Sequence, residues 1–270
     1  MRQRAAVFLG LLLCLLPMRA ISESIKSFGG FIVGGTPTDV AHHPWQAALN
    51  VSLANGDSVL CGGAIIDKRW VLTAAHCFGR DGGHARAQVK TGVTNFKTEG
   101  AWVNVVRIVP HPRYNDDAAG YAVKDDIALV MIETDAKGAP IARQNGNLPF
   151  RSGQLLEVTG WGTLSDGSLE PSMILRQTQV RYVDNATCQQ SYPGETITGG
   201  MACAGLQDGG RGPCQGDSGG PLVFKTGEAV GTLIGIVSAG KGCALPRFYG
   251  IYTRVSEYND WIAQTTNPSH

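Results

Sequence analysis

Residues 216–221 of this 270-residue chain read Gly216-Asp217-Ser218-Gly219-Gly220-Pro221, and they restrict the folds that are compatible with the sequence. A serine hydroxyl is a weak nucleophile unless a base takes its proton and donors stabilise the developing oxyanion. Glycines beside Ser218 would let backbone amides approach a substrate closely. The same pattern fits the nucleophile elbow of α/β-hydrolases, in which the acid and then the histidine follow the serine. Only His270 lies downstream of Ser218, so chain order argues against that fold and against a lipase or esterase.

The base must therefore come from upstream, where the histidines are His42, His43, His76, His84 and His111. His76 ends the apolar run Leu72-Thr73-Ala74-Ala75-His76-Cys77, and a disulfide at Cys77 would hold its imidazole in place, as a general base requires. An orienting carboxylate is offered by Asp126, which opens Asp126-Ile127-Ala128-Leu129. An acid that enters a buried strand is costly unless it has a partner. Asp125 is equally available on these grounds.

Composition indicates an all-β protein. Charged residues make up 17% of the chain and there are 36 glycines, which excludes a coiled coil and a charged disordered chain. Short runs rich in Val and Ile predict strands; examples are 45–49, 70–75, 103–109, 127–132, 155–159, 175–183 and 233–237. One terminal helix is predicted, with Ser256 as its cap and Val255, Tyr258, Trp261 and Ile262 on one face. The polar stretch 134–153 fits a join between two β halves.

The N-terminus predicts secretion. Residues 1–20 read as a signal peptide: Arg2 and Arg4 precede an apolar run over 5–17, which is too short to span a membrane. Removing it removes Cys14 and leaves six cysteines, an even set that favours disulfides over zinc, because no zinc-binding spacing is present. Sequence alone does not pair them. Lys and Arg (23) nearly balance Asp and Glu (22), so no nucleic-acid surface is expected.

Taken together, the motifs resemble the trypsin/chymotrypsin-type (S1 family) serine proteases from Ile32 to about Ala263. The likeness rests on six motifs in order: Ile32-Val33-Gly34-Gly35, Thr73-Ala74-Ala75-His76-Cys77, Asp126-Ile127-Ala128-Leu129, Gly160-Trp161-Gly162, residues 216–221, and Tyr252-Thr253-Arg254-Val255. The resemblance implies an S1 peptidase domain over 32–265. It also implies a fold of two packed six-stranded antiparallel β-barrels (chymotrypsin-like) with a C-terminal α-helix and a site between the barrels.

The resemblance also assigns roles. Ser218 would be the nucleophile, His76 the general base and acid, and Asp126, preferred to Asp125, the carboxylate that fixes the imidazole tautomer. The amides of Gly216 and Ser218 would form the oxyanion hole. The implied disulfides are Cys61–Cys77, Cys188–Cys203 and Cys214–Cys243. Residues 21–31 would be an activation propeptide, whose removal frees the α-amino group of Ile32 to pair with Asp217.

The residues of the substrate pocket predict specificity. The family places the pocket base at Gly212, followed by Pro213 and Gln215, with Gly240 and Gly250 as open walls and Ser238, Ala239 and Gly240 as the strand that binds substrate. Enzymes that cut after Lys or Arg usually carry aspartate at the base, so Gly212 predicts a preference for large apolar or aromatic residues. Ala239 stands where Trp is usual. Phe31 before Ile32 suggests autoactivation, and Arg211 and Arg247 offer the alternative of an acidic preference.

The expected protein is thus a secreted serine endopeptidase that acts on proteins or peptides, is made as a zymogen and is inhibited by proteins. No cofactor or metal is expected. Val93 stands where a calcium-binding loop of the family would need glutamate, and Tyr249 stands where the sodium-responsive members carry Tyr, which is weak evidence for sodium. We expect a monomer that binds no membrane once the signal is removed. The alternative is a catalytically silent homologue that acts as a secreted binding protein.

Overall fold

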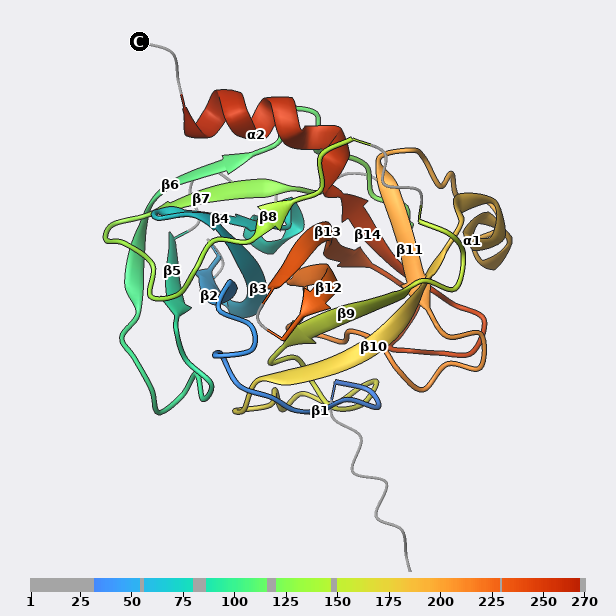
Figure 1. Cartoon of the computed structure of the whole chain (residues 1–270), viewed down its shortest axis with the longest axis horizontal. Helices are drawn as coiled ribbons and strands as arrows, with labels where there is room; N and C mark the ends of the chain where they lie inside the picture. Colours follow the sequence, from blue (N-terminus) through green and yellow to red (C-terminus); the bar gives the residue numbers. More distant parts are fainter. Residues whose placement is uncertain are drawn as a thin grey trace, which may run out of the picture.

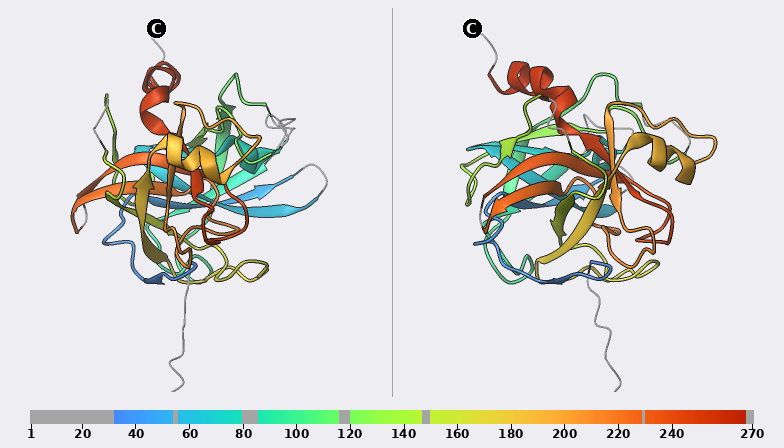
Figure 2. Two further views of the ribbon diagram at one scale, coloured as in Figure 1. Left: turned by 90° about the vertical axis from the view of Figure 1, so that its right-hand side faces the viewer. Right: turned by 45° about the vertical axis from the view of Figure 1, so that its right-hand side comes forward.

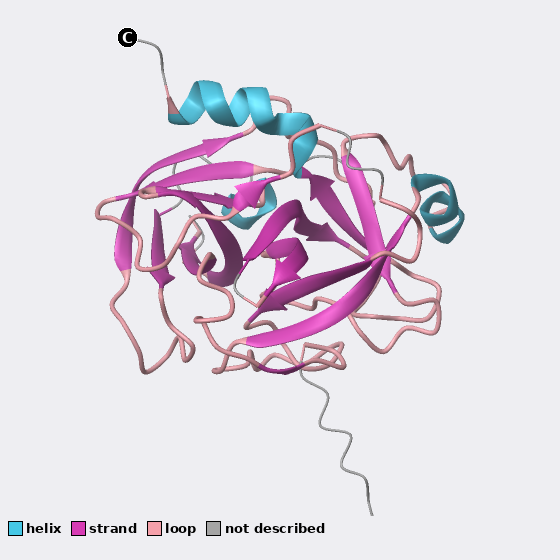
Figure 3. Ribbon diagram, viewed as in Figure 1, coloured by secondary structure: helices cyan, strands magenta, loops and turns pink. Residues whose placement is uncertain are grey.

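The computed structural model describes residues 32–53, 56–79, 86–115, 120–146, 150–228 and 230–267. The expected signal peptide, the propeptide, Cys14 and His84 lie outside these residues. In the described part of the chain, no helix combines the length and apolarity needed to cross a bilayer. Strands make up most of the regular secondary structure, and the two α-helices lie at its edges (Figure 3).

The first half of the chain forms a closed six-stranded antiparallel barrel in the order β2-β3-β4-β7-β6-β5. Its strands are β2 (Gln46–Ser52), β3 (Ser58–Asp67), β4 (Trp70–Thr73), β5 (Arg86–Thr91), β6 (Val103–Pro110) and β7 (Ala128–Ile132). Val, Leu and Ile side chains such as Leu49, Leu72 and Leu129 are fully buried in its core. Figure 1 shows this barrel on the left, coloured blue to green.

The second half forms a second barrel in the order β10-β11-β14-β13-β12-β9, which the pairing of β9 with β10 closes. Its strands are β9 (Leu155–Gly160), β10 (Arg176–Val183), β11 (Met201–Gly205), β12 (Pro221–Gly227), β13 (Val230–Ala239) and β14 (Gly250–Arg254). β1 (Thr36–Pro37) adds to the edge of β10, and β8 (Ala142–Arg143) pairs with β13 in parallel. The fold is therefore the pair of six-stranded barrels that the family resemblance implies.

The segment between β7 and β9 connects the barrels and carries β8. Its Gln144 carbonyl accepts a hydrogen bond of 2.7 Å from the Asn259 side chain, which ties the connection to the C-terminal helix. Ile141 in the same segment is buried in the core of the first barrel. The connection is thus packed against the first barrel and hydrogen-bonded to the C-terminal helix.

The described residues contain four helical segments: the 3₁₀ helices Ala75–Phe78 and Val255–Tyr258, α1 (Asn185–Ser191) and α2 (Asn259–Thr266). α2 lies against the first barrel, at the end of the molecule away from β1 (Figures 1 and 2). Tyr258 and Ile262 are buried there, as the predicted helical face requires. The predicted cap is wrong: α2 begins at Asn259, and Ser256 lies in the preceding 3₁₀ turn, where its hydroxyl is buried.

α1 is a helix that sequence periodicity did not predict. Its N-cap is Asp184, whose side chain accepts a hydrogen bond of 2.9 Å from the Thr187 amide. A carboxylate at this position satisfies an amide that has no partner within the helix. The pKa of Asp184 is lowered to about 2 by its hydrogen bonds with Ser152 and Thr187.

Candidate active site

His76 lies in the 3₁₀ turn that follows β4, between the two barrels. The disulfide between Cys61 of β3 and the adjacent Cys77 fixes this turn to the barrel wall. The His76 imidazole remains partly open, with 29% of its side chain exposed. A partly exposed imidazole on a rigid turn is suited to exchange protons with a bound substrate.

Asp126 lies two residues before the start of β7 and orients His76. Its Oδ2 lies 2.8 Å from the His76 Nδ1, and its Oδ1 accepts a hydrogen bond of 2.9 Å from the His76 backbone amide. Two contacts from one carboxylate fix both the ring and the backbone of the histidine. Burial alone would raise the pKa of the Asp126 carboxyl, but the charge and hydrogen bonds of His76, together with a hydrogen bond from Ser238, lower it.

Asp126 is also held by the second barrel. The Ser238 hydroxyl donates to Oδ2 at 2.5 Å, and the Thr253 hydroxyl donates to the Asp126 carbonyl at 2.6 Å. From the sequence, Ser238 was expected only on the substrate strand, and Thr253 had no expected role. The motif that contains Thr253 was visible, but its contact with a residue 127 positions away was not.

Asp125, the neighbouring acid, faces a different environment. Its Oδ1 lies 2.9 Å from the Arg113 guanidinium and accepts a hydrogen bond of 3.1 Å from the Tyr258 hydroxyl. Its backbone has a positive φ of 54°, which turns consecutive side chains apart. The structure therefore brings Asp126, and not Asp125, to His76.

Ser218 lies in the turn that precedes β12, close to the turn of His76. Its carbonyl accepts a hydrogen bond of 2.7 Å from the Gly62 amide and lies 3.8 Å from the Cys77 sulfur. The next residue, Gly219, has a φ of 79°, and a Cβ there would lie 2.1 Å from the Thr73 hydroxyl. Only glycine permits this approach, which seats the Ser218 turn against the end of β4 beside His76.

Gly216 precedes Ser218 by two residues and has a φ of 92°, in the left-handed region that favours glycine. The Asp217 amide between them donates to the Cys214 carbonyl at 3.0 Å, which closes the turn. The two residues predicted for the oxyanion hole therefore belong to one tight turn. Its backbone shape depends on glycine at position 216.

Asp217 is fully buried beneath this turn. Its carboxylate accepts hydrogen bonds from the amides of Gly162, at 2.8 Å, and Cys214, at 3.0 Å. A Cβ on Gly160 or Gly162 would lie 2.2 and 2.4 Å from its oxygens, so the two glycines around Trp161 provide the space for this acid. Burial raises the pKa of Asp217 to about 7, although both amide hydrogen bonds act to lower it.

The Ile32 segment lies against the same region. Ile32 is fully buried, and the Val33 carbonyl accepts a hydrogen bond of 3.2 Å from the Gly212 amide. Gly34 packs so closely against the Gly210 carbonyl that a Cβ would lie 2.1 Å from its oxygen. The start of the predicted domain therefore contacts the loop that carries the pocket base.

The predicted substrate-binding residues surround one cavity of about 180 Å³ that reaches Ser218. Its lining includes all seven of them: Gly212, Pro213, Gln215, Ser238, Ala239, Gly240 and Gly250. The described lining contains no Asp or Glu. Arg211 also lines it but is exposed, whereas Arg247 does not line it and belongs to a neighbouring cavity. The structure thus gives no support to two arginines acting in the primary pocket.

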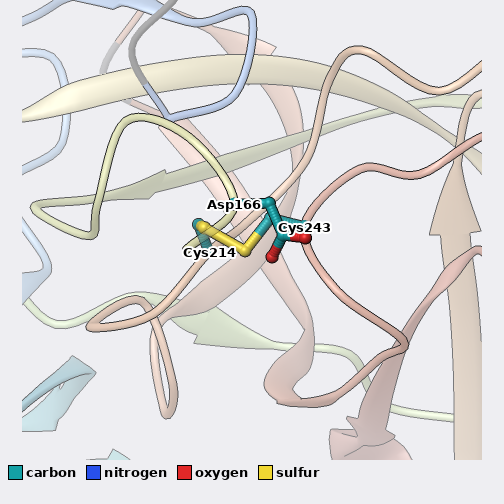
Figure 4. Close-up of side chains that lie close together, drawn as sticks. All are labelled: Asp166, Cys214 and Cys243. Atoms are coloured by element: carbon teal, nitrogen blue, oxygen red, sulfur yellow. A yellow bond between two sulfur atoms is a disulfide. The ribbon is translucent and has the colours of Figure 1, made fainter. Parts of the chain in front are cut away.

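Three disulfides are present, and they pair as the resemblance implies: Cys61–Cys77, Cys188–Cys203 and Cys214–Cys243. The third joins the two loops on either side of the cavity. Asp166 lies beside it (Figure 4), and the three side chains resemble a ligand cluster for a metal. Thiolates are the metal-binding form of cysteine, and both sulfurs here are bonded to each other, so this cluster is not a metal site.

Two barrels with this order of strands, and a His–Asp pair beside a glycine-flanked serine, define a chymotrypsin-like protease scaffold. A family model described as Trypsin matches residues 32–262. Trypsin 5G1 of Aedes aegypti is 34% identical over 255 residues, which cover 93% of this chain and 90% of that protein. Serine protease 1 of Rattus norvegicus is 37% identical over 242 residues, which cover 87% and 89%. This chain belongs to the trypsin family of serine proteases.

Proposed function

We propose that this protein is a secreted serine endopeptidase, made as an inactive precursor, that cleaves peptide bonds after large apolar or aromatic residues. The observation that supports catalysis most strongly is the doubly held His76. Its ring and its backbone both contact Asp126, and the Ser218 turn packs beside it. A scaffold used only for binding would not need this constellation.

In the proposed reaction the Ser218 Oγ attacks the carbonyl carbon of the substrate, and the His76 Nε2 takes the hydroxyl proton. The amides of Gly216 and Ser218 stabilise the negative charge on the carbonyl oxygen. His76 then gives its proton to the departing amine, and an acyl-enzyme remains. Water, deprotonated by His76, attacks the ester. As the acid leaves, His76 gives that proton to the Ser218 Oγ, which returns both residues to their starting state. Asp126 holds the imidazole and stabilises its charged form throughout.

The proposed specificity rests on the pocket base. Gly212 is buried and no carboxylate lies among the described lining residues, so a substrate lysine or arginine would be desolvated without a partner. An apolar ring carries no charge and therefore has no such desolvation cost in the same place. The glycines at 240 and 250 bring backbone rather than side chains to the cavity. These features favour large uncharged residues.

The proposed zymogen mechanism rests on Asp217. While Ile32 is joined to Phe31 its nitrogen is an uncharged amide, and Asp217 is a buried acid with a raised pKa. Cleavage after Phe31 would create an ammonium group that can pair with it and stabilise the turn at Gly216 and Ser218. An enzyme that prefers Phe could make this cut itself. If a precursor with Ser218→Ala, made alone, still matures at Ile32, autoactivation is excluded.

The function is tested by mapping the sites cut in a diverse peptide mixture by protein that begins at Ile32, with Ser218→Ala as the control. We expect cuts after Phe, Tyr, Trp or Leu that are absent in the control. Cuts after Lys or Arg would retain the mechanism and refute the specificity. No cutting by folded protein with a verified N-terminus at Ile32 would favour the binding-protein alternative.

A further inference from the structure

A second cavity of about 640 Å³ lies next to the primary pocket. We call it the aromatic groove and define it by four rings in its lining: Tyr121, Tyr192, Phe248 and Tyr249. Tyr121 lies in the loop between β6 and β7 of the first barrel. Tyr192 follows α1, and the other two rings lie between β13 and β14. Lys241, Phe248 and Tyr249 line both cavities, so the aromatic groove continues directly from the primary pocket.

The rings of the groove form one packed face. The Tyr192 ring lies 5.8 Å from Tyr121 and 6.0 Å from Phe248, at tilted and edge-on angles that aromatic pairs prefer. The Tyr192 hydroxyl donates to the Tyr249 carbonyl. Tyr192 is almost fully buried, whereas 39% of Tyr121 is exposed. The groove floor is therefore formed before any ligand binds.

A carboxylate fixes the Tyr121 side of the groove. The two oxygens of Glu195 accept hydrogen bonds from the amides of Tyr121, at 2.9 Å, and Ala122, at 3.1 Å. Gly120 has a φ of 106°, and a Cβ there would lie 2.4 Å from a Glu195 oxygen. Glu195 thereby joins a loop of the first barrel to one of the second. Because both its oxygens are already bonded to amides, this acid is engaged in structure.

Two cations at the rim have no acidic partner among the described residues. Lys241 is exposed, and its Nζ lies 4.6 Å from the centre of the Phe248 ring, a contact that holds the ammonium group beside the groove. Arg247 is exposed on the same loop and lines the groove as well. Glu195 keeps its negative charge, but the two cations outnumber it, so the lining of the groove has a net positive charge that complements an anion.

The groove is next to the strand that is expected to bind substrate. That strand, 238–240, has alanine where the family usually has tryptophan, and Lys241 follows it directly. Three residues of a peptide can pair with 238–240. Ser238 lies at the end of this strand nearest His76, because its hydroxyl donates to Asp126. If the residue before the cleaved bond is counted as the first and pairs at that end, residue-by-residue pairing places the fourth residue beside Lys241. With alanine at 239, no indole ring stands between the peptide and the groove.

We propose that the aromatic groove binds an acidic side chain of the peptide substrate, at the third or fourth residue before the cleaved bond. The carboxylate contacts Lys241 and Arg247, and its methylene groups lie on the aromatic floor. This inference rests on the proposed peptidase function and adds a second determinant of specificity to it.

The test uses enzyme that begins at Ile32 and peptides that share Phe before the cleaved bond. They differ only at the third and fourth positions, which carry Glu, Gln, Tyr or Lys in turn. We expect kcat/KM for the better Glu peptide to exceed that of its Gln counterpart about three- to fivefold, as one or two exposed ion pairs allow. The ratio should fall as salt rises from about 0.05 to about 0.5 M, because salt screens exposed charges.

The variant that tests the assignment is Lys241→Gln/Arg247→Gln, in which the Glu-to-Gln ratio should fall to about one. Its matched control is Lys68→Gln/Lys97→Gln. These two lysines are exposed and line neither cavity, so the control removes the same charge and should keep the ratio and the rate of the native enzyme.

Equal cleavage of the Glu and Gln peptides by the native enzyme would overturn the inference and leave the proposed peptidase intact. Persistence of the Glu preference in Lys241→Gln/Arg247→Gln would also overturn it, as would faster cleavage of the Tyr peptide than of the Glu peptide. Failure to cleave any peptide of the set would overturn both the inference and the proposed function.

Discussion

The substitution Gly212→Asp is expected to change the preference of the primary pocket from Phe to Lys and Arg. A Cβ at position 212 would meet the Ala244 Cβ at 3.4 Å and its Cα at 3.8 Å, which are ordinary contact distances. The φ of Gly212 does not lie in the left-handed region, so the new side chain needs no backbone change. Its carboxylate would enter a cavity that has no acid in its described lining.

The magnitude follows from the cost of an unpaired buried charge. Leaving one partner of a buried ion pair unmatched costs about 3 kcal/mol or more. At about 1.36 kcal/mol per factor of ten, the new aspartate should raise the ratio of kcat/KM for a Lys peptide to that for a Phe peptide about 100-fold. The value of kcat/KM for the Phe peptide should fall, because the new carboxylate is desolvated without a partner when an uncharged substrate binds.

The assay compares kcat/KM for two peptides that differ only in Phe or Lys before the cleaved bond. Gly212→Asn is the matched control, since its side chain has the same shape and no charge. The reasoning is refuted if the two variants change the ratio equally. It is also refuted if folded Gly212→Asp keeps the native ratio, or if the native enzyme already prefers Lys.

Three further predictions concern the buried turn and the disulfides. Gly162→Ala should abolish activity and destabilise the protein, because its Cβ would lie 2.4 Å from the Asp217 carboxylate. Burial raises the pKa of Asp217 to about 7 from the ordinary aspartate value of 3.8. Between these two values the folded precursor keeps a proton that the unfolded chain has released. The stability of the precursor therefore falls as pH rises from about 4 to about 7. In a Ser218→Ala precursor, Asp217→Asn should therefore raise the melting temperature more at about pH 8 than at about pH 4. Replacing Cys188 and Cys203 together by alanine should lower the free energy of unfolding by about 3 kcal/mol, measured in urea, without changing the preference for Phe over Lys before the cleaved bond.

Each of these predictions has its own control or contrary result. Gly199→Ala is the control for Gly162→Ala, because a Cβ at 199 would meet no atom within 4 Å and should leave activity unchanged. A pH-independent effect of Asp217→Asn would contradict the raised pKa. For the disulfides, the comparison is the loss of Cys214 and Cys243 together, which should alter cleavage specificity because that bond joins the loops of the pocket. Equal specificity changes from both disulfide variants would contradict this distinction.

The sequence predicts the fold well where local pattern determines structure. The runs 103–109 and 155–159 are strands within one residue of their predicted ends. Val and Ile are concentrated in the first run, and apolar and polar residues alternate over 156–159 in the second. β11 is a strand of Met, Ala, Cys and Gly that local propensity does not favour; its pairing with β10 and β14 determines it. Ser256 was misassigned as a cap because the 3₁₀ turn before α2 shifts the cap by two residues, from Ser256 to Tyr258.

The candidate site divides in the same way. His76, Asp126 and Ser218 could be proposed from the sequence because each lies in a short motif, although the residues alone left Asp125 and Asp126 equal and the family resemblance chose between them. The hydrogen bonds that Glu195 accepts from the amides at 121 and 122 could not be predicted, since they join residues more than 70 positions apart. Their only trace in the sequence is Gly120, one glycine among 36, whose role depends on a neighbour that the sequence does not reveal.

The contacts of Asp126 show why this site must be built from tertiary structure. Its carboxylate meets His76 from the first barrel and Ser238 from the second, and its carbonyl meets Thr253 of β14. The buried carboxylate needs His76 and Ser238, since the loss of either leaves part of its charge uncompensated, and Thr253 satisfies the buried backbone carbonyl. The same hydrogen bonds therefore hold the two barrels together and hold the imidazole in place. Any substitution that shifts one barrel against the other should reduce catalysis before it unfolds the protein.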